Sequence, residues 1–363
     1  GVEDGVIKIA MTTAQSGNLA AYGNLNAGQD IYFDWLNANG GIGPDGLQIE
    51  TIIKDDAYVA DLTIEFVAEL LQSDRPFMIQ TLGSPNTFAV YNTLNEACVP
   101  QPMVWTGHQA WGDPVEHPWT TGMQMSYATE SLLWGSWIDS NFDEPVKVAA
   151  LVMDNDFGLA YEQGFADYAE KNPDVISEVE FVRHDPAAAT LTNEITTLAA
   201  EEPNVFISMT AGNPCLLAIQ EAARAGLIET ADAVFTPSVC KSVASYMGPA
   251  GDAADGWYII GGGLKDTTDP QWEDDLWISF SNEQLEEGGG DPEISLQGQG
   301  FSERGWSMEQ MLRIAADLPD GLTRTNLILA QRGMTSMSHP ALLDGIGFGM
   351  EGNNDAYFIE GSD

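Results

Sequence analysis

The sequence predicts an α/β protein made of two open parallel sheets, each covered by helices on both faces. Its 363 residues exceed the usual size of a single core and favour two domains. Short apolar strands alternate with helices that carry an apolar stripe, and this alternation is typical of parallel sheets. The alternation starts again near residue 146, which indicates a second unit of the same kind.

The first unit is predicted from strands followed closely by amphipathic helices. The helix after the first strand carries Ala27, Ile31, Trp35 and Leu36 on one face and stops at Gly40-Gly41, a common helix end. The next helix has its apolar stripe over 62–71. The strands of this half are predicted at 7–11, 47–53, 77–82 and 103–105.

The second unit repeats this order of elements. Its strands are predicted at 146–152, 179–182, 205–209, 233–236 and 257–260. After them the sequence predicts an exposed acidic loop at 283–291, a helix at 306–318 and a terminal hairpin over the glycine-rich segment 345–360.

The charge balance excludes several classes of partner. The chain has 13 Lys and Arg against 55 Asp and Glu, a formal net charge of −42. Such a surface repels nucleic acid and anionic membrane surfaces, so neither is expected as a partner. No apolar run reaches the ~18 residues of a membrane-spanning helix, so we expect no membrane insertion of this chain.

Motifs of catalysis are missing from the sequence. It contains no glycine-rich nucleotide-binding pattern, no nucleophile elbow, no Cys-x-x-Cys and no pair of histidines four residues apart. The glycines at 261–263 follow a strand but precede no clear helix, which disfavours a dinucleotide-binding enzyme. The loop 154–158 lacks the ligand spacing of a calcium site. We therefore expect no enzyme activity, no cofactor and no metal.

Short polar and aromatic residues follow the predicted strands in both halves. Ligands of open α/β sheets bind at the carboxyl edge of the strands, where helix N-termini also offer free N–H groups. A single Ser or Thr there is also an ordinary helix cap. The recurrence in both halves favours a ligand site; the segments are Ser16-Gly17, Gly83-Ser84, Trp105-Thr106-Gly107, Thr210-Ala211-Gly212 and Ser238.

The chain resembles the type I periplasmic solute-binding proteins, the leucine/isoleucine/valine-binding family of ABC importers. The resemblance rests on Ser16-Gly17 and Tyr22-Gly23, then Asn37-Ala38-Asn39-Gly40-Gly41-Ile42, then Asp55-Asp56, in this order. It implies two Rossmann-like lobes joined by a three-crossing hinge near residues 124, 256 and 340, with the ligand cleft between them. The expected N-terminal lobe is 1–124 plus 257–340, and the C-terminal lobe 125–256 plus 341–363.

The resemblance also implies the ligand-binding residues. Gly83-Ser84 matches the loop that holds a ligand carboxylate, and Trp105-Thr106-Gly107 matches the second loop. Tyr22 and Phe157 match aromatic wall positions, although they also fit a place in the lobe core. Tyr127, Ala211 and Ser238 occupy matched positions in the second lobe.

Those last positions depart from the family pattern. Amino-acid binders place acids where this chain has Tyr127 and Ser238, and an aromatic residue where it has Ala211. A buried ammonium group needs an anionic partner. We therefore expect an apolar organic acid, aromatic or fatty, as the ligand. The alternative is a branched-chain or other amino acid whose ammonium group is bound by another acid, such as Asp154 or Asp156.

The resemblance further implies the role of the protein. We expect it to bind a small molecule by lobe closure, as a monomer, and to deliver the ligand to an ABC permease. A sensory ligand-binding module on the same fold is the alternative. We expect export to the periplasm or cell surface, with any lipid anchor removed from this chain.

The cysteines offer a possible disulfide. Cys215 opens a helix after one strand of the second unit, and Cys240 follows the next strand. Neighbouring parallel strands can bring two such residues within bridging distance. We expect a Cys215–Cys240 disulfide, with Cys98 as a lone buried thiol; three free cysteines are the alternative.

Overall fold

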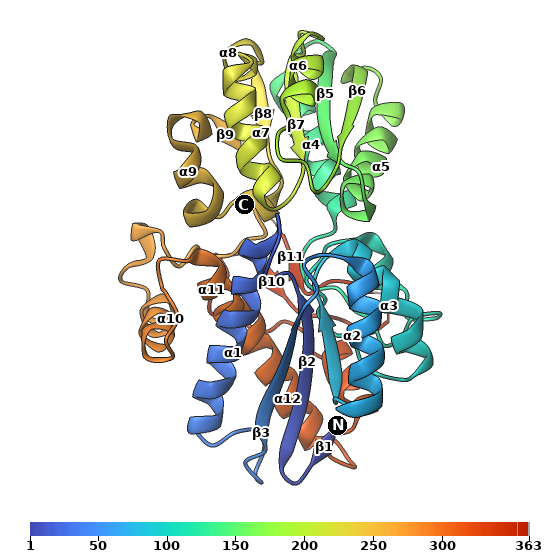
Figure 1. The fold of residues 1–363 in the computed structure, drawn as a ribbon, viewed down its shortest axis with the longest axis vertical. Coiled ribbons are helices and arrows are strands. Elements are labelled where there is room, and N and C mark those ends of the chain that lie inside the picture. Colours follow the sequence, from blue (N-terminus) through green and yellow to red (C-terminus); the bar gives the residue numbers. More distant parts are fainter. Residues whose placement is uncertain (354, 362–363) are drawn as a thin grey trace. The chain divides into compact units, whose positions relative to one another are not determined.

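The computed structural model describes residues 1–353 and 355–361, which form two compact units (Figure 1). Unit 1 comprises Gly1–Gln124 and Gly263–Gly361, and the described part of unit 2 is Met125–Gly262. Each unit is a mainly parallel sheet flanked by helices, which confirms the predicted fold class.

The sheet of unit 1 is centred on β2 (Val6–Thr13). Strand β3 (Gln48–Asp55) runs parallel along one edge of β2. The other edge pairs with β4 (Met78–Thr81) in parallel and with the short β1 (Val2–Glu3) in antiparallel orientation. The carboxyl ends of β2, β3 and β4 therefore lie at one edge of the sheet, where the loops of the candidate site begin.

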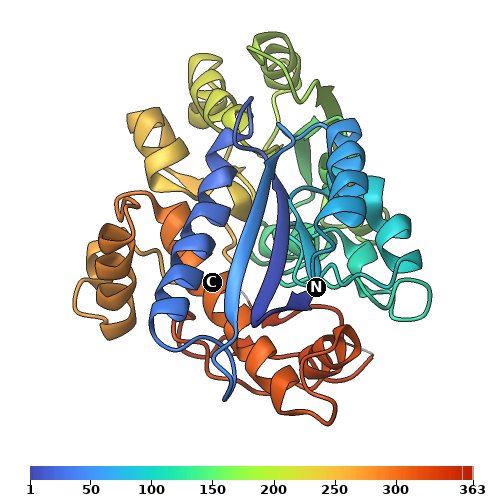
Figure 2. The same ribbon diagram turned by 60° about the horizontal axis from the view of Figure 1, so that its bottom comes forward.

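Alternate residues of β2 face the two helical layers of unit 1. Ile9 is buried in the larger core with Tyr32 of helix α1 (Gly23–Ala38), whereas Ala10 is buried with Val67 of the opposite layer. This alternation follows from the two-residue period of a strand. Figure 2 shows the blue strands between α1 on one side and α2 and α3 on the other.

The remaining elements of unit 1 surround this sheet. The helices that follow β3 and β4 are α2 (Ala60–Ser73) and α3 (Ser84–Glu96). The 3₁₀ helices are η1 (Ala20–Tyr22), η2 (Gln109–Gly112) and η6 (Pro270–Trp272). The later segment contributes α10 (Leu276–Glu287), α11 (Ser295–Gln299), the π-helical turn η7 (Gly300–Gly305), α12 (Trp306–Asp317), α13 (Arg324–Arg332), β10 (Gly347–Phe348) and β11 (Ile359–Glu360).

Unit 2 contains a parallel sheet in the order β6-β5-β7-β8-β9. Its strands are β5 (Val146–Met153), β6 (Ile176–His184), β7 (Val205–Met209), β8 (Ala233–Phe235) and β9 (Trp257–Tyr258). The helices are α4 (Tyr127–Asn141), α5 (Asp156–Lys171), α6 (Thr192–Ala199), α7 (Asn213–Arg224), α8 (Leu227–Thr230) and α9 (Gly248–Ala250). Three short turns complete it, η3 (Ser238–Cys240), η4 (Val243–Met247) and η5 (Gly251–Ala254).

The division into units differs from the expected domain limits at two places. Residues 257–262 belong to unit 2, because β9 pairs with β8. Residues 341–361 belong to unit 1, because Phe348 and Phe358 are buried in its large core and the Phe358 N–H donates to the Met123 carbonyl. The predicted terminal hairpin is present as the antiparallel pair β10–β11. Residues 362–363 lie outside the described residues.

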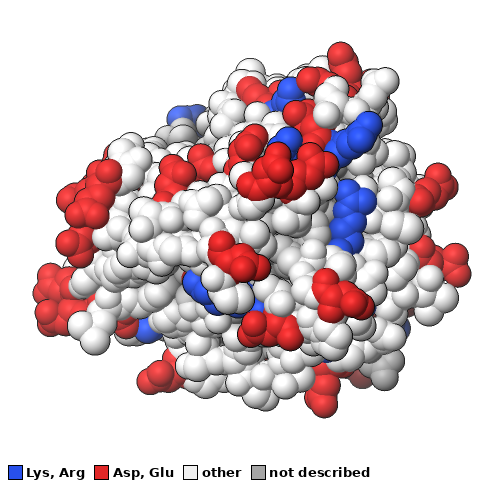
Figure 3. All heavy atoms as spheres, turned by 90° about the horizontal axis from the view of Figure 1, so that it is seen from below, with Lys and Arg blue, Asp and Glu red and all other residues white. Residues whose placement is uncertain are grey.

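Two local expectations also change. Residues 103–105 form no strand, because Met103 has φ +49° and only Trp105 makes a bridge to Leu82. Cys98 is exposed rather than buried, since the chain turns there after α3 with φ +52°. Among the described residues no helix is long and apolar enough to cross a membrane. Figure 3 shows one face, on which acidic side chains are widespread and basic ones few.

Candidate functional site

Two buried loops of unit 1 lie side by side at the carboxyl edge of its sheet. The Ser84 and Thr106 hydroxyl oxygens are hydrogen-bonded at 2.7 Å, and the Gly83 N–H donates to the Trp105 carbonyl at 3.1 Å. Ser84 and Thr106 are fully buried. The structure therefore brings together the Gly83-Ser84 and Trp105-Thr106-Gly107 segments singled out in the sequence.

These loops contain backbone N–H groups that have no acceptor within the described part of the chain. The carbonyls of Val104 and Trp105 already accept bonds, from Arg304 and Gly83. Among the described residues, no acceptor lies within hydrogen-bond distance of the backbone N–H groups of Ser84, Thr106 and Gly107. Ser84 is also the first residue of α3, so the helix dipole adds partial positive charge there.

Tyr58 lies over Gly83, a neighbour that sequence reasoning missed. A Cβ atom on Gly83 would clash with the Tyr58 ring, and Gly83 has φ +91°. Tyr58 is held by Asp56, which accepts its N–H at 3.0 Å and also accepts bonds from Thr63 and Asn86 at 2.7 Å and 3.0 Å. Burial raises the pKa of Asp56, and these hydrogen bonds oppose the rise. The Asp55-Asp56 motif thus positions the loop and the start of α3.

Tyr22 belongs to the packed part of unit 1. It ends η1 directly before α1 and is 8% exposed, so it is largely buried. Ser16-Gly17 lies on the surface, and Asp55 accepts the neighbouring Gln15 N–H at 2.8 Å. The Asp55 carboxylate therefore fixes the segment that leads into η1.

Arg304 is a second residue of unit 1 that sequence reasoning missed. It is fully buried on η7, and its guanidinium carbon lies 3.9 Å from the centroid of the Trp105 ring. Its Nη2 donates to the Val104 carbonyl at 3.2 Å, and its Nε lies 3.6 Å from Glu303 Oε1. Arg304 and Val104 are 200 residues apart, so no local pattern could pair them. The available signal was a basic residue beside an apolar helix in a chain with 13 Lys and Arg.

Tyr127 and Phe157 meet in an aromatic cluster of unit 2. Their ring centroids are 4.9 Å apart, and Tyr127 stacks on Tyr161 at 4.6 Å. Trp134 extends the stack from Tyr161 at 5.1 Å. Tyr127 and Phe157 are each 3% exposed, so they belong to the buried part of this unit as well as to its sheet edge.

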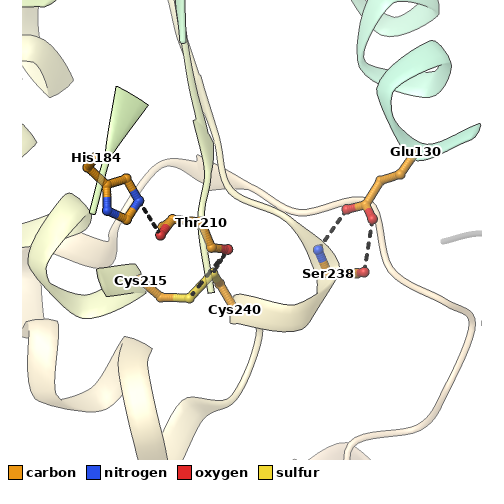
Figure 4. Close-up of a disulfide and its surroundings, with 6 residues drawn as sticks. All are labelled: Glu130, His184, Thr210, Cys215, Ser238 and Cys240. Carbon is orange, nitrogen blue, oxygen red and sulfur yellow. Dashed lines mark hydrogen bonds between the residues drawn. A yellow bond between two sulfur atoms is a disulfide. The ribbon is translucent and has the colours of Figure 1, made fainter. Parts of the chain in front are cut away.

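Cys215 and Cys240 form a disulfide, the pairing expected from the adjacent strands (Figure 4). The bond joins the first turn of α7 to η3, with Cα atoms 5.7 Å apart. It therefore ties the loop that contains Ala211 to the loop that contains Ser238. The carbonyl oxygen of Thr210, next to Ala211, lies 3.9 Å and 3.3 Å from the two sulfurs.

Glu130 holds the Ser238 loop from the other side (Figure 4). Its Oε1 accepts the Ser238 N–H at 2.7 Å, and its Oε2 accepts the hydroxyls of Ser238 at 3.1 Å and Tyr161 at 2.6 Å. Burial raises the pKa of Glu130 to about 7, against the effect of the hydrogen bonds from Tyr161 and Ser238. Glu130 lies one helical turn after Tyr127 on the same face of α4, so the signal in the sequence was an acid three residues after a matched position.

The two acids considered as alternative charge partners have other surroundings. Asp154 is 57% exposed in its side chain and lies 3.6 Å from Arg183. Asp156 is the acidic residue in the first turn of α5, which Asn155 caps through the N–H groups of Phe157 and Gly158. Within the described part of the chain, no group of three or more His, Cys, Asp or Glu residues could hold a metal ion.

Solved structures of similar fold are numerous. A branched-chain amino acid ABC transporter protein from Thermus thermophilus with bound valine has a TM-score of 0.85 at 16% identity, covering 98% of this chain and 92% of that one. A fatty acid ABC transporter substrate-binding protein from Thermomonospora curvata has a TM-score of 0.81 at 19% identity, covering 100% of this chain and 93% of that one. A solute-binding protein from R. palustris in complex with benzoate has a TM-score of 0.77 at 16% identity, covering 96% of this chain and 90% of that one.

Sequence comparison assigns the chain to a family. A comparison with curated proteins finds no significant match. The family model described as periplasmic binding protein matches residues 6–341, most of both units. With the two α/β units, this match confirms the resemblance seen in the sequence. The chain belongs to the periplasmic binding protein family.

Proposed function

We propose that this protein binds a small apolar organic acid, an aromatic or fatty carboxylate, and delivers it to an ABC importer. The observation that carries this proposal is the difference between the polar groups of the two candidate loop sets. Unit 1 offers buried N–H donors without acceptors, whereas the buried acid of unit 2 already accepts three hydrogen bonds.

A carboxylate fits the donors of unit 1. The N–H groups of Ser84, Thr106 and Gly107 come from adjacent segments, and one proton of the paired Ser84 and Thr106 hydroxyls remains for a ligand. Charge-assisted hydrogen bonds to a carboxylate are about twice as strong as neutral ones, and a helix N-terminus favours anions. Binding an anion there would satisfy donors whose burial without a partner costs roughly 1–3 kcal/mol each.

An ammonium group lacks an equivalent partner in unit 2. The two oxygens of Glu130 are engaged by Ser238 and Tyr161, so a ligand ammonium would have to displace one of these bonds. Beside Glu130, the rings of Tyr127 and Phe157 are in contact and almost completely buried. Apolar groups suit these surroundings better than charged ones, and burial contributes about 0.8 kcal/mol per methylene.

Proteins of similar fold support the choice of ligand classes to test. One is described with benzoate, one is named for fatty acids and one holds valine. At 16–19% identity these likenesses concern the fold, so the choice among them rests on the loops of this chain.

We further propose that the protein works outside the cytoplasm as a monomer, without turnover, and delivers its ligand to a membrane permease. The Cys215–Cys240 disulfide supports an oxidising compartment. Family membership supports the role of a binding protein rather than an enzyme.

A thermal-shift and calorimetric screen tests the ligand class. The panel is leucine, phenylalanine, benzoate-type acids and medium-to-long fatty acids. A ligand at about 100 times its Kd adds about 2.7 kcal/mol of stability, so the organic acids should raise the melting temperature most. A larger rise with leucine or phenylalanine would overturn the proposed ligand class.

Substitutions in the donor loops test the assignment to unit 1. Ser84→Ala and Thr106→Ala each remove a hydroxyl beside the donor N–H groups and should weaken carboxylate binding about tenfold, the effect of about 1.4 kcal/mol. Ser140→Ala is the matched control, because Ser140 is exposed and bonds only the Ser136 carbonyl. Unchanged affinity in both loop variants would contradict the assignment.

A further inference from the structure

We propose that Arg304 is a specificity-determining residue that makes the unit 1 loops select anionic over neutral ligands. It would act through Trp105 and Val104 rather than by touching the ligand. This inference rests on the proposed function, because it concerns the charge preference of the same carboxylate site.

The position of Arg304 makes it part of the loop's electrostatic environment. Its guanidinium lies on the Trp105 ring, 3.9 Å from the centroid, and donates to the Val104 carbonyl at 3.2 Å. Trp105 directly precedes Thr106 and Gly107, whose N–H groups face no acceptor among the described residues. The positive charge of Arg304 thus contacts the two residues that precede Thr106 and Gly107 in the chain. Because Arg304 is completely buried, solvent does not screen this charge.

Arg304 also sets which polar groups the loop exposes. Its Nη2 engages the Val104 carbonyl, so this carbonyl is no longer a free acceptor in the segment that leads to Thr106. The Trp105 N–H donates to the Thr81 carbonyl and the Trp105 carbonyl accepts from Gly83, so the backbone between them is fixed. The loop is therefore held in an arrangement that leaves donors for the ligand.

Glu303 is a counter-charge of Arg304, and its place bears on the sign of the effect. Its Oε1 lies 3.6 Å from Arg304 Nε, and its Oε2 accepts from Gln299 Nε2 at 2.6 Å. The contacts to Val104 and Trp105 are made by Arg304, not by Glu303. Arg304 is thus the charge in contact with the loop, and Glu303 opposes its field.

A stability role alone gives little reason for this pair. Replacing a buried ion pair with apolar residues is often neutral or stabilising, because desolvation of both charges is costly. Arg304 and Glu303 are both almost completely buried. A contribution to ligand selection explains why a cation is placed under this loop.

The test compares an acid with its neutral amide on the intact protein. Affinities for benzoate and benzamide, and for octanoate and octanamide, are measured by calorimetry for wild type, Arg304→Gln, Arg304→Lys and Glu303→Gln. We expect Arg304→Gln to lower the acid-over-amide affinity ratio about tenfold and Arg304→Lys to retain most of it. Glu303→Gln should raise the ratio severalfold, because it removes the opposing charge.

Arg313→Gln is the matched control. Arg313 lies on α12 in the same unit, is paired with Glu309 at 2.6 Å and has a side chain 41% exposed, so the same charge is lost away from the loop. Its ratio should equal that of wild type. If Arg304→Gln weakens acid and amide by the same factor, Arg304 is only structural and the inference fails.

Two further outcomes are also decisive. If Arg304→Gln does not fold by circular dichroism, an unchanged ratio in Glu303→Gln overturns the inference and a raised one supports it. If wild type binds neither benzoate nor octanoate, the proposed function fails; if it binds them and the ratios stay constant, only the role of Arg304 fails.

Discussion

At the residue scale, Gly83 occupies a position that a larger residue would disrupt. Its φ of +91° is rarely adopted by L side chains, and an added Cβ would clash with the Tyr58 ring. We expect Gly83→Ala to lower the free energy of unfolding by at least about 2 kcal/mol, combining backbone strain with displacement of Tyr58. Urea unfolding measures the loss.

Gly5→Ala separates the two causes of this loss. Gly5 has φ +80° with no atom within 4 Å of an added Cβ, so only backbone strain applies there. The excess loss at Gly83 should disappear when Tyr58→Ala is combined with Gly83→Ala. Equal losses at Gly5 and Gly83 would show that the contact with Tyr58 is unimportant.

Glu130 predicts a pH dependence of stability. Burial raises its pKa from 4.5 to about 7, against hydrogen bonds from Tyr161 and Ser238 and the charge of Lys241. The folded state therefore binds the proton more tightly than the unfolded chain. This contribution is fully present below pH 4.5, is lost as the pH rises to about 7 and stays constant above, a change of about 3 kcal/mol.

The comparison of wild type with Glu130→Gln isolates this contribution. The amide introduced by this substitution cannot titrate, so the unfolding free energy of wild type minus that of the variant should fall between pH 5 and pH 8. Urea unfolding at several pH values measures the difference and cancels the titration of other groups. A difference that does not vary with pH would contradict the raised pKa.

At the element scale, the disulfide connects the ends of two neighbouring strands. It links residues 25 positions apart, so on the chain-entropy model it stabilises by roughly 3 kcal/mol. The double variant Cys215→Ser and Cys240→Ser should lose about 3 kcal/mol of unfolding free energy and therefore melt at a lower temperature. Reduction of wild type should have the same effect, and reduction of the double variant none.

Thiol counting provides an independent check of the pairing. The chain has three cysteines, of which Cys215 and Cys240 are bridged. Denatured, unreduced protein should therefore show one reactive thiol, from Cys98, and reduced protein three. Three thiols without reduction would refute the disulfide.

The Cys215–Cys240 disulfide and Glu130 together determine how firmly the unit 2 loops are held. The disulfide fixes the loop of Ala211 to η3, and Glu130 fixes Ser238 to α4. Ser238 is thus restrained from two elements at once. Loops held in this way lose less conformational entropy on ligand binding.

At the scale of the whole molecule, charge dominates. The chain carries 55 acidic against 13 basic residues, a formal net charge of −42. Such a charge opposes the compact state by self-repulsion, and salt screens it with a Debye length of about 10 Å at 0.1 M. We expect the melting temperature to rise between about 0.05 M and about 1 M KCl.

Calorimetry in KCl and in glycerol distinguishes screening from a general solvent effect. The rise with KCl should be largest at low concentration, where screening changes most, whereas glycerol should give no such saturation. A melting temperature that stays constant in KCl would mean that the acidic groups lie too far apart to repel one another.

The sequence by itself determined the fold class and the positions of the loops. Strand and helix periods are local properties, so the alternation predicted both open sheets and placed Ser84 and Ser238 after their strands. The adjacency of consecutive strands also suggested the partner of Cys215. These features depend on residues close in the chain or in neighbouring elements.

The tertiary structure decided which distant residues meet. Arg304 contacts Val104 across 200 positions, and Glu130 contacts Ser238 across 108. The C-terminal hairpin belongs to unit 1 because Phe358 fills its core. Such pairings depend on how whole elements pack, and no periodicity encodes them; the contacts of Arg304 and Glu130 were therefore visible only in the folded chain.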